Sequence, residues 1–510
     1  MPRSYDLFYQ LSSHWADKHK VAIETGGGKL YRYSDIFAAT SRFAHALVAR
    51  GVKPGDRVAA RVEKSPEALF LYLACLRAGA AYLPLNTAYT EPELDYFLRD
   101  SEPSIFVCHP GLSEAGTLCE RAGVPTLLTL GTDDDGTLPA NASGQPDVFE
   151  DVPRSADDLA AVLYTSGTTG RSKGAMLSHG NLTSNATALA QAWRFTSNDV
   201  LLHALPIFHT HGLFVATNVA LIAGASMLYL PKFDANEIFR LMPRATTMMG
   251  VPTFYVRLLD DARLTREATA KMRLFVSGSA PLLPDTHRGF LDKTGHSILE
   301  RYGMTETGMN TSNPYEGERV PGTVGPPLPG VEVRVVNPET GETLGPEEIG
   351  MIEVRGPNVC KGYWRMPEKT KAEFRDDGFF ITGDLGKIDS RGYVHIVGRG
   401  KDLIISGGFN VYPKEVESQI DALPGVVESA VIGVPHPDFG EGVMAIVVLS
   451  KDCDLQEKDV IEALRNRLAN YKLPKRVFFA DDLPRNTMGK VQKNLLRDAY
   501  SDLFRGKSTA

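Results

Sequence analysis

The segment YTSGTTGRSKG, residues 164–174, contains residue types that suit phosphate binding. Its three glycines allow the backbone to approach a ligand closely, and successive backbone N–H groups can form an anion-binding nest. Hydroxyl side chains and Lys173 add hydrogen-bond donors and a positive charge. The segment matches neither the Walker A pattern nor the glycine pattern of dinucleotide-binding folds, and by itself it is equally typical of a solvated turn.

Further segments combine small, aromatic and charged residues in ways that could bind a nucleotide. SGSAPL (277–282) ends an expected strand in small residues, and RYGMTETGMN (301–310) holds an aromatic ring, hydroxyls and the Glu306 carboxylate. FFITGDLGKID (379–389) is expected to place Asp384 in a tight turn between glycines. Alone, each has an ordinary explanation as a turn or an Asx turn, so their order along the chain is the informative feature.

Two more segments lie toward the C-terminus, GRGKDLIISGGFNVYP (398–413) and LPRNTMGKVQK (483–493). The second places Lys490 directly after a glycine, which alone is most simply a solvated charge. Chance does not readily supply this whole ordered set of segments between residues 164 and 490. The set therefore favours one extended nucleotide site.

The elements that must position these residues alternate between helices and strands through much of the first 400 residues. Residues 34–51 predict an amphipathic helix with Ser34 as its N-cap and Gly51 just past its end. After residue 159 a strand, the glycine-rich loop and a helix from about Gly180 are expected. This alternation is typical of an α/β fold with a mainly parallel sheet. The polar residues 131–158 are expected to form a surface connection.

The C-terminal part of the chain has a different pattern. Short strands and turns after about residue 320 predict a β-rich subdomain, and residues from 401 predict a compact α+β unit. The expected domain boundary lies near residue 400. A chain of 510 residues exceeds what one hydrophobic core usually supports, so several domains are expected.

Composition excludes several classes of protein. The formal charge of −7 argues against a nucleic-acid-binding surface, and no run of 18 apolar residues predicts a membrane span. The first twenty residues lack the apolar stretch of a secretory signal. Five scattered cysteines suit a reducing cytoplasm and form no metal-binding pair. The HTH triplet at 209–211 has the spacing of one strand face, and no third metal ligand is evident.

Together, and in this order, the segments resemble those of the acyl-adenylate-forming (ANL) superfamily, which contains acyl-CoA synthetases, peptide-synthetase adenylation domains and luciferases. The resemblance covers nearly the whole chain. It implies a large N-terminal domain of α/β subdomains with a β-rich subdomain, residues 1–400, and a small mobile α+β domain, residues 401–510. It also implies the chemistry: ATP converts a carboxylic acid into an acyl-AMP, which the thiolate of coenzyme A then attacks.

The same resemblance implies roles for individual residues. Glu306 and Thr165 correspond to Mg²⁺ ligands, Tyr302 to the ring that stacks on adenine, and Asp384 with Arg399 to the ribose-binding pair. The expected catalytic residues are Lys490, Glu306 and His209. The expected nucleotide-binding and CoA-binding residues are Thr165, Ser166, Gly167, Thr168, Thr169, Gly170, Lys173, Gly278, Ser279, Ala280, Pro281, Glu300, Arg301, Tyr302, Gly303, Met304, Thr305, Asp384, Arg399, Lys401, Ser406, Gly407 and Gly408.

Within this set, Lys401 corresponds to the hinge about which the small domain of the family rotates, at a position where many relatives have Asp. Ser406, Gly407 and Gly408 are expected to line the tunnel for the pantetheine arm of CoA after rotation. Lys490 is also a candidate for regulation by a lysine acetyltransferase and deacetylase, because acetylation removes its charge.

The identity of the acid follows from a narrower resemblance. ALPIFHTHGLFVATNV, GSAPLLPDTHR, ERYGMTETGMNTSNPY and LPRNTMGKVQKN are very similar to segments of bacterial malonyl-CoA synthetases of the MatB type. This implies malonate, with methylmalonate as a second substrate, and Arg288, His209 and Ser279 as malonate contacts. Without this resemblance, Arg288 is most simply a solvated arginine on a helix. His209 is then an aromatic residue that lines the acid pocket without recognising charge. Two alternatives are a ligase for another short-chain, medium-chain or aryl acid, and a relative without catalytic activity.

Overall fold

The protein is described from a computed structural model, in which the described residues are 6–165, 172–407, 409–465, 467–486 and 489–504. The chain forms two compact units. The first contains residues 1–333 and 354–380, and the second contains residues 334–353 and 381–510. Each unit is described by itself below.

One sheet of the first unit has six strands in the order β6-β5-β3-β4-β7-β8, parallel except for the antiparallel pair β7–β8. Its core brings Leu83, Phe106 and Val162 of the strands against Phe97 and Leu118 of the helices. The strands are β3 (Arg57–Arg61), β4 (Ala81–Pro84), β5 (Ile105–Cys108), β6 (Thr126–Thr129), β7 (Leu159–Thr165) and β8 (Lys173–Ser178). The helices before and between them are α2 (Tyr33–Ala49), α3 (Pro66–Arg77), α4 (Glu91–Ser101), α5 (Ala115–Ala122) and α6 (Thr137–Ala142).

The second sheet of this unit has eight strands in the order β14-β13-β12-β11-β9-β10-β1-β2. Its strands are β1 (Val21–Thr25), β2 (Leu30–Arg32), β9 (Val200–His203), β10 (Ser226–Tyr229), β11 (Thr247–Gly250), β12 (Leu274–Ser277), β13 (Leu299–Met304) and β14 (Gly308–Ser312). Its helices are α1 (Leu7–Ser12), α7 (His179–Ala192), the π-helix η1 (His211–Thr217), α8 (Asn218–Ile222), α9 (Ala235–Leu241), the 3₁₀-helix η2 (Met242–Arg244), α10 (Pro252–Leu259) and α11 (Pro284–Thr294).

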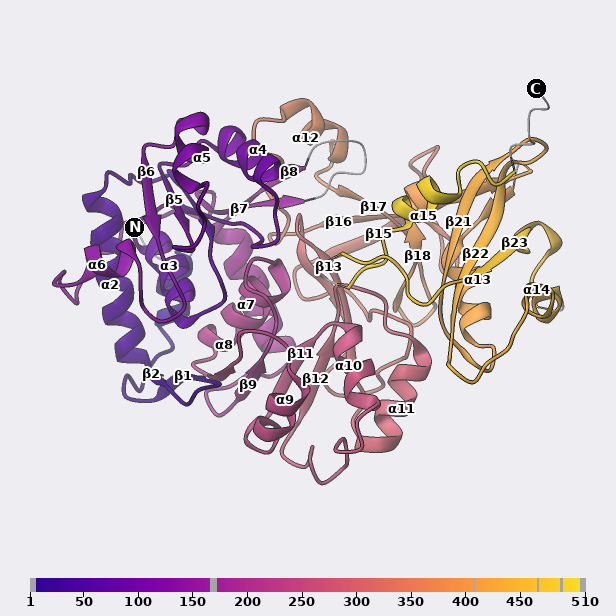
Figure 1. Ribbon diagram of the computed structural model, residues 1–510, viewed down its shortest axis with the longest axis horizontal. Helices are drawn as coiled ribbons and strands as arrows, with labels where there is room; N and C mark the ends of the chain where they lie inside the picture. Colours follow the sequence, from indigo (N-terminus) through magenta and orange to yellow (C-terminus); the bar gives the residue numbers. More distant parts are fainter. Residues whose placement is uncertain (1–5, 166–171, 408, 466, 487–488, 505–510) are drawn as a thin grey trace. The chain divides into compact units, whose positions relative to one another are not determined.

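Helices α9, α10 and α11 lie alongside strands β11 and β12 (Figure 1). Edge-to-face contacts among the rings of Tyr255, Phe275 and Phe290 join α10, β12 and α11. Such contacts add to the hydrophobic stabilisation of the cluster that also contains Met248 and Ile298. This packing fixes the ends of β12 and β13, where the candidate site lies.

Parallel strands with helical crossovers confirm the predicted α/β class, but three local predictions were wrong. Helix α2 begins at Tyr33, so Ser34 lies inside its first turn, and Asp35 accepts the Arg32 N–H at 2.7 Å in place of a Ser34 cap. Gly51, with φ of +90°, does follow the helix as predicted. The expected surface connection 131–158 contains α6, whose Leu138 is fully buried, and a loop-like composition concealed this short helix.

The third wrong prediction concerns the segment after the glycine-rich loop. A loop leading directly into a helix was expected, but strand β8 intervenes and α7 begins at His179. The Ser178 hydroxyl caps α7 by accepting the Asn181 backbone N–H at 3.1 Å, and the side-chain Oδ1 of Asn181 accepts the Ser178 N–H at 2.9 Å. The six-residue strand begins inside the motif, at Lys173, and was therefore not recognised as a separate element.

The second unit contains most of a four-stranded sheet and all of a five-stranded one. The first has the order β15-β16-β17-β18, with β15 (Glu332–Val336), β16 (Gly350–Arg355), β17 (Phe380–Ile388) and β18 (Val394–Arg399). The five-stranded sheet is made of β19 (Ile404–Ser406), β20 (Phe409–Val411), β21 (Val426–His436), β22 (Gly440–Leu449) and β23 (Arg476–Phe479). The helices of this part of the chain are η3 (Gly400–Asp402), α13 (Pro413–Asp421), α14 (Glu457–Arg465), η4 (Asn470–Lys472) and α15 (Lys493–Tyr500), while α12 (Pro367–Glu373) belongs to the first unit.

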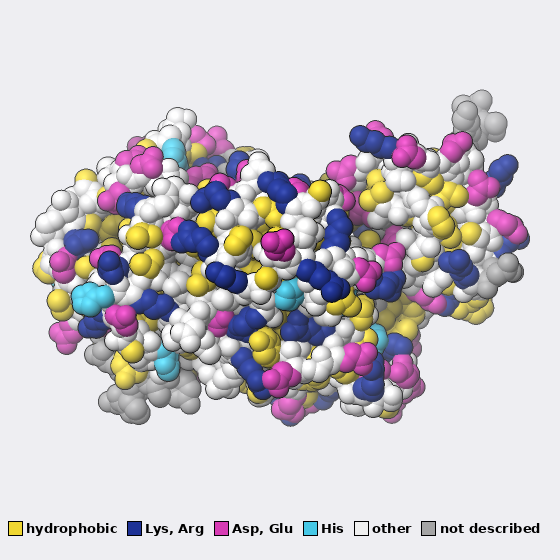
Figure 2. Space-filling model, turned by 90° about the horizontal axis from the view of Figure 1, so that it is seen from below, with side chains coloured by type: hydrophobic (Ala, Val, Ile, Leu, Met, Phe, Trp, Pro, Cys, Tyr) yellow, Lys and Arg dark blue, Asp and Glu magenta, His cyan; other side chains and the backbone are white. Residues whose placement is uncertain are grey.

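The surface carries charges of both signs. Lys and Arg side chains are interspersed with Asp and Glu side chains on the face drawn in Figure 2. Arg240 pairs with Glu237 at 2.6 Å, and Arg263 with Asp261 at 2.6 Å, among other exposed ion pairs. Among the described helices, none is long and apolar enough to cross a membrane.

Candidate active site

The two flanks of the glycine-rich loop are held side by side in the first unit. Strands β7 and β8 pair in antiparallel register, with Thr165 opposite Lys173. The loop is therefore the connection of a hairpin, and its ends are fixed by the sheet. Five of the predicted phosphate-binding residues lie outside the described residues: Ser166, Gly167, Thr168, Thr169 and Gly170.

Glu306, in the turn between β13 and β14, lies next to this hairpin. The Thr165 hydroxyl donates to its Oε1 at 3.3 Å, and the Tyr363 hydroxyl donates to the same oxygen at 3.1 Å. The residue is buried, with 6% of its surface exposed. A carboxylate and a hydroxyl oxygen this close are the hard oxygen donors that suit Mg²⁺, which keeps its other positions for water and phosphate. Among the described residues, no group of three or more His, Cys, Asp and Glu could hold a metal ion by itself.

Lys173 has a carboxylate partner that no sequence motif indicated. Its Nζ lies 2.9 Å from Oε1 of Glu373, and 4.2 Å from the centroid of the Tyr363 ring. Tyr363 donates to Glu373 as well as to Glu306. Burial opposes ionisation of Glu373, but hydrogen bonds from Lys369, Tyr363 and Lys173 hold its pKa below the usual value. Tyr363 and Glu373 come from residues 354–380, a segment in which the sequence showed no recognisable signal.

The loop after β12 brings predicted adenine-binding and acid-binding residues together. Ser279 has a φ of +73°, an unusual conformation for a residue with a Cβ, of the kind that concentrates at functional sites. Its hydroxyl lies 3.1 Å from Nδ1 of His211, and the His211 N–H donates to Nδ1 of His209 at 3.3 Å. Gly278 packs against Arg301 so closely that a Cβ there would lie 2.3 Å from the guanidinium carbon. A side chain at this position would have to displace the Arg301 guanidinium.

The spacing of the HTH triplet suggested a strand, but the triplet does not lie on one. His209 precedes the π-helix η1 and His211 is its first residue. Burial, with the nearby Arg301 charge as a second cause, lowers the pKa of His209 to about 4 and that of His211 well below its usual value. Both imidazoles are therefore neutral near pH 7 and can each donate one hydrogen bond.

Strand β13 carries two buried charged residues in succession. Glu300 accepts the Gly322 N–H at 3.1 Å, and burial raises the pKa of its carboxyl to about 8. Arg301 is 4% exposed, and burial lowers the pKa of its guanidinium to about 9. Successive strand residues point to opposite faces, so the two side chains do not meet.

The rest of the predicted adenine segment forms the β13–β14 hairpin. Tyr302 is half-buried and pairs with Thr311, and Met304 pairs with Gly308 next to Thr305. A Cβ on Gly303 would lie 2.1 Å from the Gly308 carbonyl oxygen, so the close approach of these strands requires glycine.

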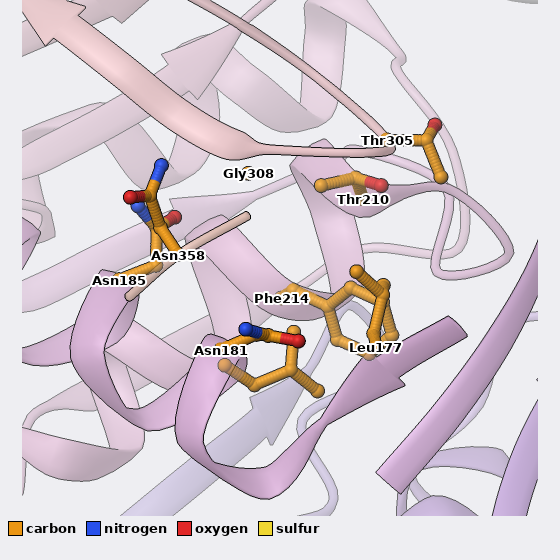
Figure 3. Close-up of a pocket in the computed structure, with 9 residues that line it drawn as sticks. Leu177, Asn181, Asn185, Thr210, Phe214, Thr305, Gly308 and Asn358 are labelled. Atoms are coloured by element: carbon orange, nitrogen blue, oxygen red, sulfur yellow. The ribbon is translucent and has the colours of Figure 1, made fainter. Parts of the chain in front are cut away.

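A small pocket lies behind this hairpin (Figure 3). Thr210 and Phe214 reach it from around η1, Asn181 and Asn185 from α7, and Thr305 from the hairpin turn. Its volume of about 10 Å³ accommodates no more than a single water molecule. We therefore place neither a nucleotide nor an acid in it.

Arg288, the predicted partner of a second carboxylate, lies on α11 with a side chain that is 62% exposed. Its guanidinium forms an ion pair with Asp285, one helical turn away. In this structure Arg288 is thus engaged at the surface of the helix, while His209 and Ser279 lie with His211 in a half-buried cluster.

The second unit holds the predicted ribose-binding pair. Asp384 and Arg399 are in register on β17 and β18, and Oδ1 of Asp384 lies 2.8 Å from Nε of Arg399. Asp384 lies within a strand, and the predicted turn was wrong because Gly383, with φ of +72°, bends the strand without ending it. Thr382 supports both residues: its hydroxyl accepts the Asp384 N–H at 3.0 Å, and its carbonyl accepts Nη1 of Arg399 at 3.3 Å.

Lys490 belongs to the same unit, close enough to interact electrostatically with Asp384 and Arg399. Much of its side chain is exposed, but loss of hydration at the ammonium and the Arg399 charge lower its pKa to about 8, against the effect of Asp384. Lys401 is exposed on η3, Ser406 is buried at the end of β19, and Gly407 follows with φ of +59°. Gly408 lies outside the described residues.

Residues 13–364 match the model of the AMP-binding enzyme family, and residues 415–490 match that of the AMP-binding enzyme C-terminal domain. The chain belongs to the AMP-binding enzyme family, within the ANL superfamily. The predicted family and fold class are thereby confirmed.

Three relatives show which members of the family are similar to this chain. The crystal structure of ATP-bound MatB from Rhodopseudomonas palustris is 64% identical, with a TM-score of 0.96 over 98% of this chain and 99% of that one. The mitochondrial malonate–CoA ligase ACSF3 of Mus musculus is 38% identical over 88% of this chain and 84% of its own length. The feruloyl-CoA synthase of an Amycolatopsis species is also 38% identical, over 94% of this chain and 96% of its own length.

Proposed function

We propose that this protein is an AMP-forming malonate–CoA ligase that also accepts methylmalonate. In the first step a malonate carboxylate oxygen attacks the α-phosphorus of ATP, which gives malonyl-AMP and releases pyrophosphate. In the second step the CoA thiolate attacks the acyl carbon, which gives malonyl-CoA and releases AMP. The observation that carries the proposal is the 64% identity to MatB over 98% of the chain, at a TM-score of 0.96.

The first unit supplies residues for the triphosphate. Lys173 and the glycine-rich hairpin would bind the phosphates of ATP, and an ammonium in this position stabilises the charge of the departing pyrophosphate. Glu306 and Thr165 would hold Mg²⁺, with oxygens 3.3 Å apart. When bound, the ion would neutralise phosphate charge. Tyr302 would stack on adenine, beside the loop from Gly278 to Pro281.

The second unit supplies the ribose-binding and lysine functions. Asp384 would accept hydrogen bonds from the ribose hydroxyls, because Arg399 holds its carboxylate in place at 2.8 Å. Lys490 would bind the acid carboxylate and the α-phosphate during adenylation, and its acetylation would stop that step. We propose that the mobile domain begins at residue 401, with Lys401 as its hinge, and that Ser406, Gly407 and Gly408 contact CoA.

A second candidate is a CoA ligase for an aryl or other monocarboxylic acid. The feruloyl-CoA synthase, at 38% identity, is as similar in sequence as the malonate–CoA ligase ACSF3, and it favours this alternative. The two candidates differ in whether the acid pocket must bind a second negative charge. They share the nucleotide site, so only the acid preference separates them.

The test is AMP release by the full chain with ATP, CoA and Mg²⁺ across malonate, methylmalonate, acetate, butyrate and ferulate. We expect the highest kcat/KM with malonate and a product of the mass of malonyl-CoA. A preference for ferulate or butyrate over malonate would support the second candidate instead. Omitting CoA should allow malonyl-AMP to form once and then stop turnover, which identifies the adenylate route.

A further inference from the structure

Arg301 is a buried cation that has no counter-ion among the described residues. Its side chain lies in a strand interior at 4% exposure, and within the described part of the chain no hydrogen-bond acceptor is in reach of its Nε and Nη2. No described carboxylate forms an ion pair with it either. An uncompensated buried charge is strongly destabilising, so proteins retain one where a ligand supplies the opposite charge.

The two unpartnered nitrogens have a definite geometry. Nε and Nη2 lie on the same edge of the guanidinium plane and present two parallel N–H groups. That edge matches the two oxygens of a carboxylate in a bidentate, charge-assisted pair. A single phosphate oxygen or an adenine ring would not satisfy both donors as well.

The groups around Arg301 are hydrogen-bond donors or carry no charge. The Arg301 charge acts on the rings of both His209 and His211, and it packs on Gly278 at the start of the loop that carries Ser279. His211 keeps a further ring nitrogen, Nε2, which is buried and without a partner among the described residues. Glu300 cannot neutralise Arg301, because it lies on the other face of β13 and binds the Gly322 N–H. The cluster is thus suited to an anion that the described residues do not supply.

Arg288 differs from Arg301 in every one of these respects. It is mostly exposed, and Asp285 already neutralises it. Using Arg288 for the substrate would require breaking that pair and moving the side chain, whereas Arg301 is already buried and held by packing against Gly278.

We propose that Arg301 is the specificity-determining residue that binds the distal carboxylate of the dicarboxylic acid, assisted by His211. The proposal rests on the proposed function, since it concerns the acid of the same reaction. It removes Arg301 from the nucleotide-binding set in which sequence comparison placed it, and it makes Arg288 at most a secondary contact.

The test compares acids that differ only in the distal charge. Arg301→Gln, Arg301→Lys, the rival candidate Arg288→Gln and the control Arg263→Gln, at an exposed arginine paired with Asp261, are assayed with malonate and with monomethyl malonate, whose distal group is an uncharged ester. We expect Arg301→Gln to lower kcat/KM for malonate by about 100-fold and that for monomethyl malonate by less than about fivefold. Arg301→Lys should recover part of the malonate activity, because it restores charge without the bidentate edge. Arg263→Gln should change both values by less than about fivefold, and Arg288→Gln should lack the charge-specific loss.

Several results would overturn the proposal. Equal losses with both acids would make Arg301 structural, and a raised KM for ATP without acid discrimination would return it to the nucleotide site. A charge-specific loss in Arg288→Gln alone would assign the role to Arg288. If the wild-type protein preferred succinate to malonate, malonate would be refuted as the substrate. The role of Arg301 would then be measured with the same variants and succinate. A wild type indifferent to distal charge would refute both proposals.

Discussion

Glu300 and Arg301 are neighbours in the chain, but their side chains lie on opposite faces of strand β13 and therefore do not interact. Arg301 retains its charge next to two neutral histidines, while Glu300 is buried against the Gly322 N–H and its pKa is raised to about 8. At neutral pH Glu300 is therefore mostly protonated. A buried neutral carboxyl costs far less than a buried carboxylate, which explains how the strand tolerates it.

This raised pKa predicts a dependence of stability on pH. The unfolded chain releases the Glu300 proton near its usual pKa of about 4.3, whereas the folded chain keeps it until about pH 8. Stability from this group is therefore complete at low pH and is lost as pH rises between those two values. Glu300→Gln keeps an acceptor for the Gly322 N–H and has no proton to lose. We expect it to raise the free energy of unfolding at pH 9 by up to about 5 kcal/mol, and much less at pH 5.

Urea unfolding at pH 5 and pH 9 measures this difference. Glu342→Gln, at an exposed position, is the matched control and should leave the pH dependence as it is in the wild type. An unchanged pH dependence in Glu300→Gln would show that the carboxyl is already ionised in the folded state at neutral pH.

The residue types of the nucleotide site could be predicted from sequence, but burial could not. Arg288 and Arg301 are both arginines close to the SGSAPL loop, and nothing in their spacing indicates that one is exposed and the other enclosed. The difference arises because Arg301 lies on a strand between β12 and β14, whereas Arg288 lies on the outer part of a helix. Glu373 was missed for a related reason: its role depends on a contact with Lys173, 200 positions away in the chain.

At the scale of elements, the π-helix η1 positions the histidines of the site. Its Gly212 carbonyl lies 3.0 Å from Nε2 of His203 and accepts the Thr217 hydroxyl at 2.8 Å. A wide helical turn of this kind leaves carbonyls available for such contacts and is frequent at functional sites. No local sequence pattern predicts it, which is why the HTH triplet was assigned to a strand.

Gly212 is the residue on which this turn depends. A Cβ at this position would lie 1.9 Å from the Pro206 carbonyl oxygen, so Gly212→Ala must displace the backbone. We expect a loss of about 2 kcal/mol or more in unfolding free energy and a higher KM for the acid, because His211 moves with the turn. Thermal or urea unfolding and acid titration of AMP release would measure the two effects.

Gly289→Ala in α11 is the control for that substitution. A Cβ there would meet only Leu259 at 3.8 Å, an ordinary contact, and alanine in a helix interior is favoured by up to about 1 kcal/mol. Equal effects of the two substitutions would mean that the π-helix adapts and that Gly212 is not required by the close approach.

For the whole molecule, the proposed functional residues are divided between the two units. Thr165, Lys173 and Glu306 belong to the first, and Asp384, Arg399 and Lys490 to the second. The class of fold could be predicted from the order of the motifs along the chain. The extent of each unit could not, because residues 334–353 pack with the C-terminal part although they are far from it in sequence.

This division predicts that the two half-reactions can be separated by mutation. In adenylation, negative charge accumulates between the acid carboxylate and the α-phosphate, where the Lys490 ammonium is proposed to act. Removing such a positioned donor typically lowers a rate by about 10²–10³. Thioester formation starts from malonyl-AMP, in which that bond is already made. Lys490→Ala should therefore nearly abolish malonyl-AMP formation and still convert supplied malonyl-AMP and CoA to malonyl-CoA.

Both half-reactions are measured for Lys490→Ala, for Lys401→Pro and for Lys451→Ala as an exposed-lysine control. Lys401→Pro should show the opposite bias, because proline fixes φ at the proposed hinge and so impairs the second step while sparing the first. Lys451→Ala should alter neither step. If Lys490→Ala slowed both steps equally, the lysine would support the fold of the second unit, and its electrostatic interactions with Asp384 and Arg399 would be structural. A slow second step alone would place Lys490 in CoA binding. Only a selective loss of adenylation agrees with a lysine that acts on the α-phosphate.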